Sequence, residues 1–376
     1  MKKTKVVIFF GGQSTEYEVS IKSARSIYKA IDKSKYEIIP IYIAKSGLWV
    51  KGDTPAKILA SKEKLSYKKV LMMNSDNSRD LITFSDLKDQ VSVKQQVIAF
   101  SILHGSLGED GTIQGLFEFI NMPYVGCGVL GSALGMNKIK QKQLLSYYKL
   151  PVVNFFGLNK NNFKSNLEKK ALLKNIEKHF RKEYPLFVKP ANNGSSVGVN
   201  KVRSIKQLEK ALYDAAIYDS EILIEQGVED IREIEVSVLG NDNPEVSVCG
   251  EIITKREFYD YEAKYKDKQT ELIVPAKITA ALTKKLQNYA KDAFLALNCF
   301  GMARVDFFIE KKSEKVWINE INTIPGFTSV SMYPKLWEYS GISYGNLIDK
   351  LVNLGLEKWQ QKQQIKRSMS TNNNYD

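Results

Sequence analysis

The segment Lys5-Val6-Val7-Ile8-Phe9-Phe10-Gly11-Gly12 opens the chain with an apolar run that ends at two glycines. An amphipathic stretch follows at 19–31, and further apolar runs follow at 38–43 and 97–103. Strand, helix and strand in this order predict a parallel sheet, because parallel strands need a crossover connection. We therefore expect the first third of the chain to form an α/β sheet whose first strand begins near Lys5.

The length and composition are those of a soluble multidomain protein. At 376 residues the chain exceeds what one hydrophobic core usually organises, which predicts two or three domains. No window approaches the ~20 apolar residues of a membrane span, so membrane insertion is not expected. The start lacks a signal-peptide pattern, and the three cysteines (Cys127, Cys249 and Cys299) are far apart without a C-x-x-C motif. These features predict a cytoplasmic protein.

The formal net charge of +13 raises the question of a nucleic-acid partner. The lysines are spread along the chain rather than gathered in one region, so the excess reflects a Lys-rich composition. We expect no nucleic-acid partner.

Changes in pattern along the chain predict domain boundaries. A long helix is expected at 132–148, and the strand pattern changes again after Gly227. These changes predict an N-terminal domain at 1–135, a central domain at 136–226 and a C-terminal domain at 227–358. The Gln- and Asn-rich end at 359–376 is expected to be a frayed helix and a disordered polar tail.

Two familiar nucleotide motifs are excluded. Gly126 to Gly131 matches G-x-G-x-x-G, but the segment 150–154, where a dinucleotide site needs an acidic residue, contains none. We therefore interpret these glycines as a tight turn between domains. The chain also lacks G-x-x-x-x-G-K-[ST], so any ATP is not bound by a P-loop.

A lysine ends an apolar run at Lys189 and leads into the small-residue loop 190–198. Such a loop can fold over phosphates with its backbone N–H groups while the lysine supplies a charge. An ordinary hairpin turn with a surface lysine fits equally well, and the loop alone does not decide between them.

Charged side chains interrupt two later apolar strands. Arg304 and Asp306 share one face of the first strand, and Glu320 and Asn322 share one face of the second. Such side chains are costly in an apolar strand unless they are paired or bind a metal. The oxygen ligands suit Mg²⁺, and the alternative is a structural Arg–carboxylate pair.

Two polar residues follow early strands. Thr15 and Glu18 have the spacing of a capping box, so Glu18 either caps the following helix or receives a substrate ammonium. His104 ends the run at 97–103, where α/β proteins bind ligands. His179, in a charged helical stretch, is expected to lie on the surface.

Taken together, six segments in register resemble the D-alanine–D-alanine ligases of the ATP-grasp superfamily over nearly the whole chain. They are 11–20, 104–115, 189–198, 259–265, 304–306 and 319–332. The resemblance implies a three-domain ATP-grasp fold with an N-terminal Rossmann-like domain and ATP between the central and C-terminal sheets.

The resemblance also implies a nucleotide site and two Mg²⁺ ions, for which Mn²⁺ can substitute. By this resemblance, Lys138, Lys189 and Lys264 contact the phosphates, and Glu225 and Glu233 contact the adenosine. Further nucleotide contacts fall to Ser196, Val228 and Asn322. The metal ligands are Asp306, Glu320 and Asn322.

The implied reaction joins two D-alanine molecules through an acyl phosphate and releases ADP and phosphate for peptidoglycan precursor synthesis. Glu18, with His104 nearby, holds the first substrate's ammonium. Arg304 and the backbone N–H of Gly326 stabilise the tetrahedral oxyanion. Ser331 and Met332 border the second substrate.

Tyr265 bears on specificity as well as on closure. By resemblance, Ser195 and Tyr265 hydrogen-bond with Glu18 and tie a lid loop over the site. Related ligases that use D-lactate or D-serine depart from tyrosine at the position of Tyr265, so this chain is expected to use D-alanine twice. The family also implies a homodimer.

Overall fold

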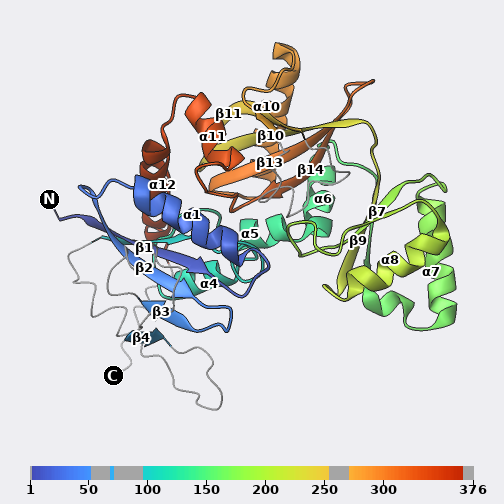
Figure 1. The fold of residues 1–376 in the computed structure, drawn as a ribbon, viewed down its shortest axis with the longest axis horizontal. Coiled ribbons are helices and arrows are strands. Elements are labelled where there is room, and N and C mark those ends of the chain that lie inside the picture. The colour runs from blue at the N-terminus through green and yellow to red at the C-terminus, as the bar shows by residue number, and fades with distance from the viewer. Residues whose placement is uncertain (1, 52–67, 72–95, 254–270, 367–376) are drawn as a thin grey trace.

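The computed structural model describes residues 2–51, 68–71, 96–253 and 271–366 of the chain. It has a mixed α/β fold in which three β-sheets follow one another along the sequence, each with its own helices (Figure 1). The mixed α/β class agrees with the sequence-based prediction. In the part of the chain that is described, no helix has the length and apolar character to cross a membrane.

The first sheet has the strand order β4-β3-β2-β1-β5. Its strands are β1 (Thr4–Gly11), β2 (Tyr36–Ile43), β3 (Trp49–Lys51), β4 (Lys68–Leu71) and β5 (Val97–Ser101). Strand β1 pairs in parallel with β2 and β5, which confirms the predicted parallel arrangement. The pairs β2–β3 and β3–β4 are antiparallel and were not predicted.

Strand β1 is buried on both faces. Val6 and Ile8 belong to one core cluster with α1 (Tyr17–Ala30), whereas Val7 and Phe9 belong to another with α4 (Thr112–Phe119). Successive side chains of a strand point to opposite faces, so a strand covered on both sides must be apolar throughout. This accounts for the continuous apolar run that opens the chain.

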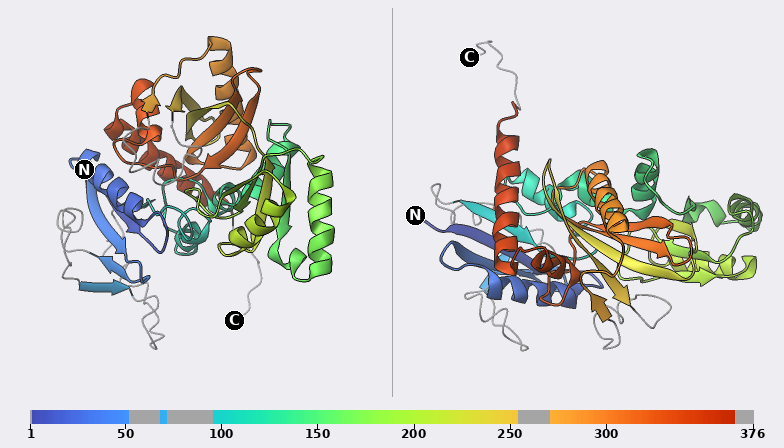
Figure 2. Two further views of the ribbon diagram at one scale, coloured as in Figure 1. Left: turned by 45° about the vertical axis from the view of Figure 1, so that its right-hand side comes forward. Right: turned by 90° about the horizontal axis from the view of Figure 1, so that it is seen from above.

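Helix α12 (Tyr344–Gln363) returns from the far end of the chain to the first sheet (Figure 2). Its residues Leu347 and Leu351 share a core cluster with Val6 and Ile8. The helix also includes residues 359–363, in the segment where a frayed helix was expected, and its buried residues end at Leu356. Residues 367–376 lie outside the described part of the chain.

The second sheet is antiparallel with the order β6-β9-β7-β8. Its strands are β6 (Phe155–Asn159), β7 (Leu186–Pro190), β8 (Asn200–Val202) and β9 (Glu221–Gln226). The 3-10 helix η1 (Lys160–Phe163) and the helices α7 (Asn166–His179) and α8 (Ile205–Ala216) accompany it. Apolar side chains of α7 and α8 pack against Val188 and Ile224, so the opposite face carries the polar residues. His179 is exposed, as predicted.

The third sheet is antiparallel with the order β12-β11-β10-β13-β14. Its strands are β10 (Ile231–Gly240), β11 (Glu245–Ile253), β12 (Glu271–Ile273), β13 (Gly301–Glu310) and β14 (Val316–Asn322). The helices of this region are α10 (Ala280–Ala296) and α11 (Met332–Tyr339). Val305 and Phe307 pack with α10 residues such as Phe294, so the alternate residues Arg304 and Asp306 face away from that helix.

The helix predicted at 132–148 is two helices, α5 (Val129–Met136) and α6 (Lys138–Tyr147). The prediction of one helix was wrong because Asn137 has an extended backbone and its side chain accepts a hydrogen bond from Lys140 N, which caps α6. Figure 1 places α6 between the second and third sheets.

The glycines of the excluded dinucleotide motif lie where the first and third sheets meet. Gly126 has a φ of 95°, and a Cβ atom on Gly301 would lie 3.0 Å from the Gly126 backbone. The motif therefore provides a turn and a close approach of two backbones.

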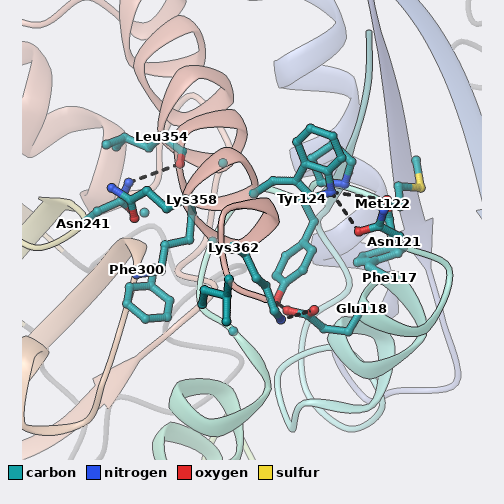
Figure 3. Close-up of a pocket in the computed structure, with 18 residues that line it drawn as sticks. Phe117, Glu118, Asn121, Met122, Tyr124, Asn241, Phe300, Leu354, Lys358 and Lys362 are labelled. Atoms are coloured by element: carbon teal, nitrogen blue, oxygen red, sulfur yellow. Dashed lines mark hydrogen bonds and ion pairs between the residues drawn. The ribbon is translucent and has the colours of Figure 1, made fainter. Parts of the chain in front are cut away.

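A hollow of about 380 Å³ lies beside this junction, between α4, α12 and the start of β13 (Figure 3). The ammonium of Lys358 lies 3.8 Å from the centre of the Phe300 ring in its wall, and Lys362 pairs with Glu118. None of the predicted site residues lines this hollow.

Candidate active site

Most of the predicted nucleotide and metal residues converge on a cavity of about 630 Å³ between the second and third sheets, whereas Asn322 does not line it. This volume is in the range of small-molecule sites. The predicted residues that line it are Lys138, Lys189, Ser195, Ser196, Glu225, Val228, Glu233, Asp306 and Glu320. Lys264 and Tyr265 lie outside the described residues.

A buried ionic cluster forms one wall of the cavity. Glu225 of β9 is 4% exposed and pairs with Lys189 of β7 and with Lys142 of α6, whose Nζ lies 2.5 Å from Glu225 Oε1. Burial alone raises the pKa of Glu225, but the two ammonium groups outweigh it and hold the pKa below its ordinary value. Lys142 was not singled out in the sequence, where a lysine in a helix gives no sign of burial.

The loop after Lys189 connects β7 to β8 in an antiparallel pair, so the hairpin interpretation is correct for the backbone. Lys189, however, is not a surface residue: its side chain is 14% exposed and paired with Glu225. Ser195 and Ser196 have positive φ values of 51° and 57°, and Lys138 Nζ donates to Asn193 O at 2.8 Å. The loop is therefore held folded over the cavity.

Glu16, and not Glu18, reaches this loop. Ser195 Oγ donates a hydrogen bond to Glu16 Oε1, so the predicted bond between Ser195 and Glu18 is wrong. Helix α1 begins at Tyr17, and two residues separated by about 200° around a helix axis point to opposite sides. Glu18 is exposed, and the predicted capping box is absent because Glu16 occupies the N-cap position without a side-chain capping bond.

The Glu16 carboxylate is enclosed by backbone from two loops. A Cβ atom added at Gly194 would lie 2.9 Å from Glu16 Oε2, and one added at Gly105 would lie 3.2 Å from it. Glycine at both positions leaves the room that the carboxylate occupies. Sequence reasoning missed Glu16, although the same Gly11 to Ser20 segment contains both glutamates.

His104 is buried beside the loop that follows β14. Its Nδ1 lies 3.0 Å from Ile324 O and 3.3 Å from Glu109 Oε1, and its Nε2 lies 3.4 Å from Ser23 Oγ. Burial lowers the pKa of His104, but the carboxylates of Glu109 and Glu16 and the Ile324 carbonyl together outweigh burial and raise the pKa above its ordinary value. Ser23 Oγ also accepts from Phe327 N at 3.3 Å. These bonds fix the segment that contains Gly326.

Strands β13 and β14 place the proposed metal ligands side by side. Asp306 lies opposite Glu320, and Arg304 lies opposite Asn322. The Arg304 guanidinium donates to both Asp306 oxygens at 2.7 Å, so the Arg–carboxylate pair that the sequence offered as an alternative is present. Asn322 Nδ2 also donates to Asp306, at 3.0 Å.

The donor chemistry of this set fits a hard divalent cation. Two carboxylates and an amide oxygen on neighbouring strands are oxygen ligands of the kind that Mg²⁺ takes alongside phosphate and water. Within the described ranges, no group of three or more His, Cys, Asp or Glu side chains is arranged to hold a metal ion. Any metal at Asp306 and Glu320 therefore needs further ligands from the amide, water or substrate.

A third carboxylate, Glu235 of β10, lies opposite Asp306 on the other side of β13. It is 4% exposed, and its Oε2 lies 3.0 Å from Arg304 Nε. Sequence reasoning missed Glu235 because its strand had not been aligned with β13.

The predicted residues for the second substrate lie at the start of α11. Ser331 Oγ lies 2.7 Å from Thr328 Oγ1 and accepts from Thr328 N at 3.1 Å. The Met332 side chain is buried in a core cluster with Ile252 and Leu336. The structure therefore places Ser331 in a polar turn and Met332 against the core.

The three sheets, with a cavity of small-molecule size between the last two and a carboxylate row beside it, define an ATP-grasp fold. Two family models match the chain: "D-ala D-ala ligase N-terminus" over residues 5–127 and "D-ala D-ala ligase C-terminus" over residues 144–353. The chain belongs to the D-alanine–D-alanine ligase family.

Individual relatives agree with the family models. The D-alanine–D-alanine ligase of Caldicellulosiruptor bescii is 47% identical, with 98% of this chain and 99% of the relative covered. The solved D-alanine-D-alanine ligase of Coxiella burnetii is 35% identical with a TM-score of 0.80, and 97% of each chain is covered. The VanG D-Ala:D-Ser ligase of Enterococcus faecalis is 34% identical with a TM-score of 0.79, covering 94% of this chain and all of that one.

Proposed function

We propose that the protein joins two D-alanine molecules to D-alanyl-D-alanine, using ATP and forming an acyl phosphate, for peptidoglycan precursor synthesis. The observation that carries the proposal is the cavity between the second and third sheets, which gathers Lys138, Lys189, Asp306 and Glu320 in a chain of this family. Lysines and carboxylates lie close together in this cavity, with Lys138 Nζ 3.6 Å from Glu320 Oε2, and such a set suits a nucleotide polyphosphate with its metal.

Lys138 and Lys189 contact the phosphates in this proposal, and Lys264 is expected to join them. The side chains of Lys138 and Lys189 are each less than 15% exposed, so their charges act where water screens them little. Ser196 supplies a further contact from the loop. Glu225, Val228 and Glu233 line the part of the cavity assigned to adenosine.

Asp306, Glu320 and Asn322 would hold two Mg²⁺ ions, or Mn²⁺ in their place. Such ions, when bound, neutralise charge on the transferring phosphoryl group. A metal at Asp306 competes with Arg304 for the same oxygens. Glu235, 3.0 Å from Arg304 Nε, then keeps the guanidinium in place.

Arg304 and the Gly326 N–H stabilise the oxyanion that forms when the amine of the second D-alanine attacks the acyl phosphate. Glu16 takes the role assigned from the sequence to Glu18, and it receives the ammonium of the first D-alanine with His104 nearby. Ser331 and the backbone at Met332 border the carboxylate of the second.

The Ser195–Glu16 bond supports a lid role for the loop over the cavity. Tyr265 is proposed to join this bond when the site closes. Closure excludes water, which would otherwise hydrolyse the acyl phosphate.

We also propose that the protein is a cytoplasmic homodimer without a nucleic-acid partner. Phe119 at the end of α4 is 84% exposed, and Leu130 on neighbouring α5 is 56% exposed, which supports an apolar contact between subunits. Analytical ultracentrifugation tests the dimer, and a Phe119→Glu, Leu130→Glu variant should sediment as a monomer.

To test the activity, the protein is incubated with ATP, Mg²⁺ and D-alanine, alone or together with D-serine or D-lactate. Phosphate release is followed, and the products are identified by mass spectrometry. D-alanyl-D-alanine from D-alanine alone supports the proposal, with L-alanine as the control. The name of the VanG relative includes D-serine. If this protein prefers D-serine, the proposed ATP chemistry stands, but the assignment of D-alanine as the second substrate is overturned.

A further inference from the structure

Lys142 is the most deeply buried lysine at the cavity, with a side chain that is 1% exposed. Its Nζ lies 2.5 Å from Glu225 Oε1 and donates to Asn319 O at 3.0 Å. Glu225 belongs to the second sheet and Asn319 to the third, so this one ammonium joins the two sheets that enclose the cavity. Both partners are acceptors. Burial holds the pKa of Lys142 below its ordinary value, and the Glu225 carboxylate opposes this effect.

Helix α6 is fixed in place on both sides of Lys142. The Gln141 side chain donates to Ile321 O and accepts from Ile321 N, both at 3.2 Å. The Ile139 side chain packs with Leu223 and Ala191. Lys142 therefore has little freedom to leave Glu225.

Lys189 is placed differently, although it shares the same carboxylate. It pairs with Glu225 Oε2, and it lies at the base of the loop over the cavity. A nucleotide phosphate that attracts Lys189 must draw it away from a carboxylate that is 4% exposed. A buried carboxylate that loses its only counter-ion is strongly disfavoured.

We propose that Lys142 is a positioning residue that acts as the permanent counter-ion of Glu225, so that Lys189 is free to move to the nucleotide phosphates. The inference rests on the proposed phosphate contact of Lys189. Without Lys142, Lys189 would be the only counter-ion of Glu225. A phosphate that binds Lys189 would then have to break the Lys189–Glu225 ion pair and leave a buried carboxylate unpaired.

The experiment compares the dissociation constants of ADP and adenosine by calorimetry in the presence of Mg²⁺, and uses their ratio as the readout. The ratio reports the phosphate contribution and cancels effects common to both ligands. Lys142→Met should reduce the preference for ADP by about tenfold or more, the scale of a charged hydrogen bond. Lys140→Met, an exposed lysine on the same helix, is the matched control and should leave the ratio unchanged.

Two further variants separate this role from a structural one. Lys142→Met combined with Glu225→Gln should recover the ADP preference, because the carboxylate that retains Lys189 is gone. In a Lys189→Met background, Lys142→Met should reduce the preference no further. Equal loss of ADP and adenosine affinity in Lys142→Met, or no recovery in the double variant, overturns the proposal.

If Lys142→Met does not fold, Glu225→Gln alone decides. It should keep or increase the ADP preference, and a decrease contradicts the counter-ion role. A wild-type protein that binds ADP no better than adenosine would instead overturn the phosphate contact of Lys189, and the proposed function with it.

Discussion

Ser195 Oγ donates a hydrogen bond to the Glu16 carboxylate, which joins the loop of the second sheet to the start of helix α1 beside the first sheet. The bond connects segments that are 179 positions apart in the sequence. Because the loop and the start of α1 are joined by this bond, neither segment can move without the other. The bond therefore holds the loop over the cavity.

Glu16→Gln should lower kcat/KM for D-alanine by about ten- to a hundredfold, since it removes the charge of the hydrogen bond and of the proposed ammonium contact. Glu18→Gln, two residues along and exposed, is the matched control and should change kcat/KM by less than about threefold. Steady-state kinetics of phosphate release measures both. A larger loss in Glu18→Gln would restore the assignment made from the sequence.

Asp306→Asn should abolish product formation at ordinary Mg²⁺ concentrations and weaken Mn²⁺ binding, because it removes a carboxylate from the proposed metal ligands. Titration with Mn²⁺ followed by electron paramagnetic resonance measures binding without relying on turnover. Asp292→Asn, exposed on α10, should behave as wild type. Unchanged Mn²⁺ binding by Asp306→Asn would argue that Asp306 serves only the pair with Arg304.

Glu225 should make the protein sensitive to acid. Its pKa is lowered in the folded state from the ordinary value of 4.5, so the unfolded state binds more protons as the pH falls below that value. The stabilisation is present above about pH 4.5 and is lost as the pH falls through the lower folded pKa. Between about pH 5.5 and pH 3.5, Glu225→Gln should therefore lose less stability than wild type in urea unfolding. Glu209→Gln, on the surface of α8, should follow the wild-type slope.

Leu351→Ala should lower the free energy of unfolding by about 2–5 kcal/mol, because the leucine is fully buried in the cluster between α12 and the first sheet. Chemical denaturation measures the change. Asn353→Ala, exposed on the same helix, should alter stability by less than about 0.5 kcal/mol. A similar loss in both variants would mean that burial of Leu351 does not decide the stability of α12, because alanine favours a helix more than either replaced residue.

Continuous apolar runs and period-two alternation carried most of the correct fold predictions. The apolar run from Val6 to Phe10 predicted a strand in a parallel sheet, and alternation in β13 placed Arg304 and Asp306 on one face. The break at Asn137 was missed because an asparagine within a helical pattern is recognised as a cap only when its backbone is seen to be extended.

The parts of the site that sequence reasoning missed depend on contacts between distant segments. In the sequence, Lys142 and Glu235 look like ordinary charged residues. Their roles become visible only in the ion pair between Lys142 of α6 and β9 and in the pairing of β10 with β13. The choice between Glu16 and Glu18 depends on where α1 begins, and a shift of one or two residues reverses which side chain faces the loop. Roles for Lys264 and Tyr265 remain predictions, since both lie outside the described residues.

The packing of α12 on the first sheet has a consequence for synthesis on the ribosome. Strand β1 is synthesised well before Leu347 and Leu351 of α12, which complete one side of its core. Domains generally fold as units while the chain emerges, but this one cannot complete its core until α12 has been made. The apolar residues that α12 will cover on β1 and α1 stay exposed during that interval, so this segment needs chaperone protection until α12 has been made.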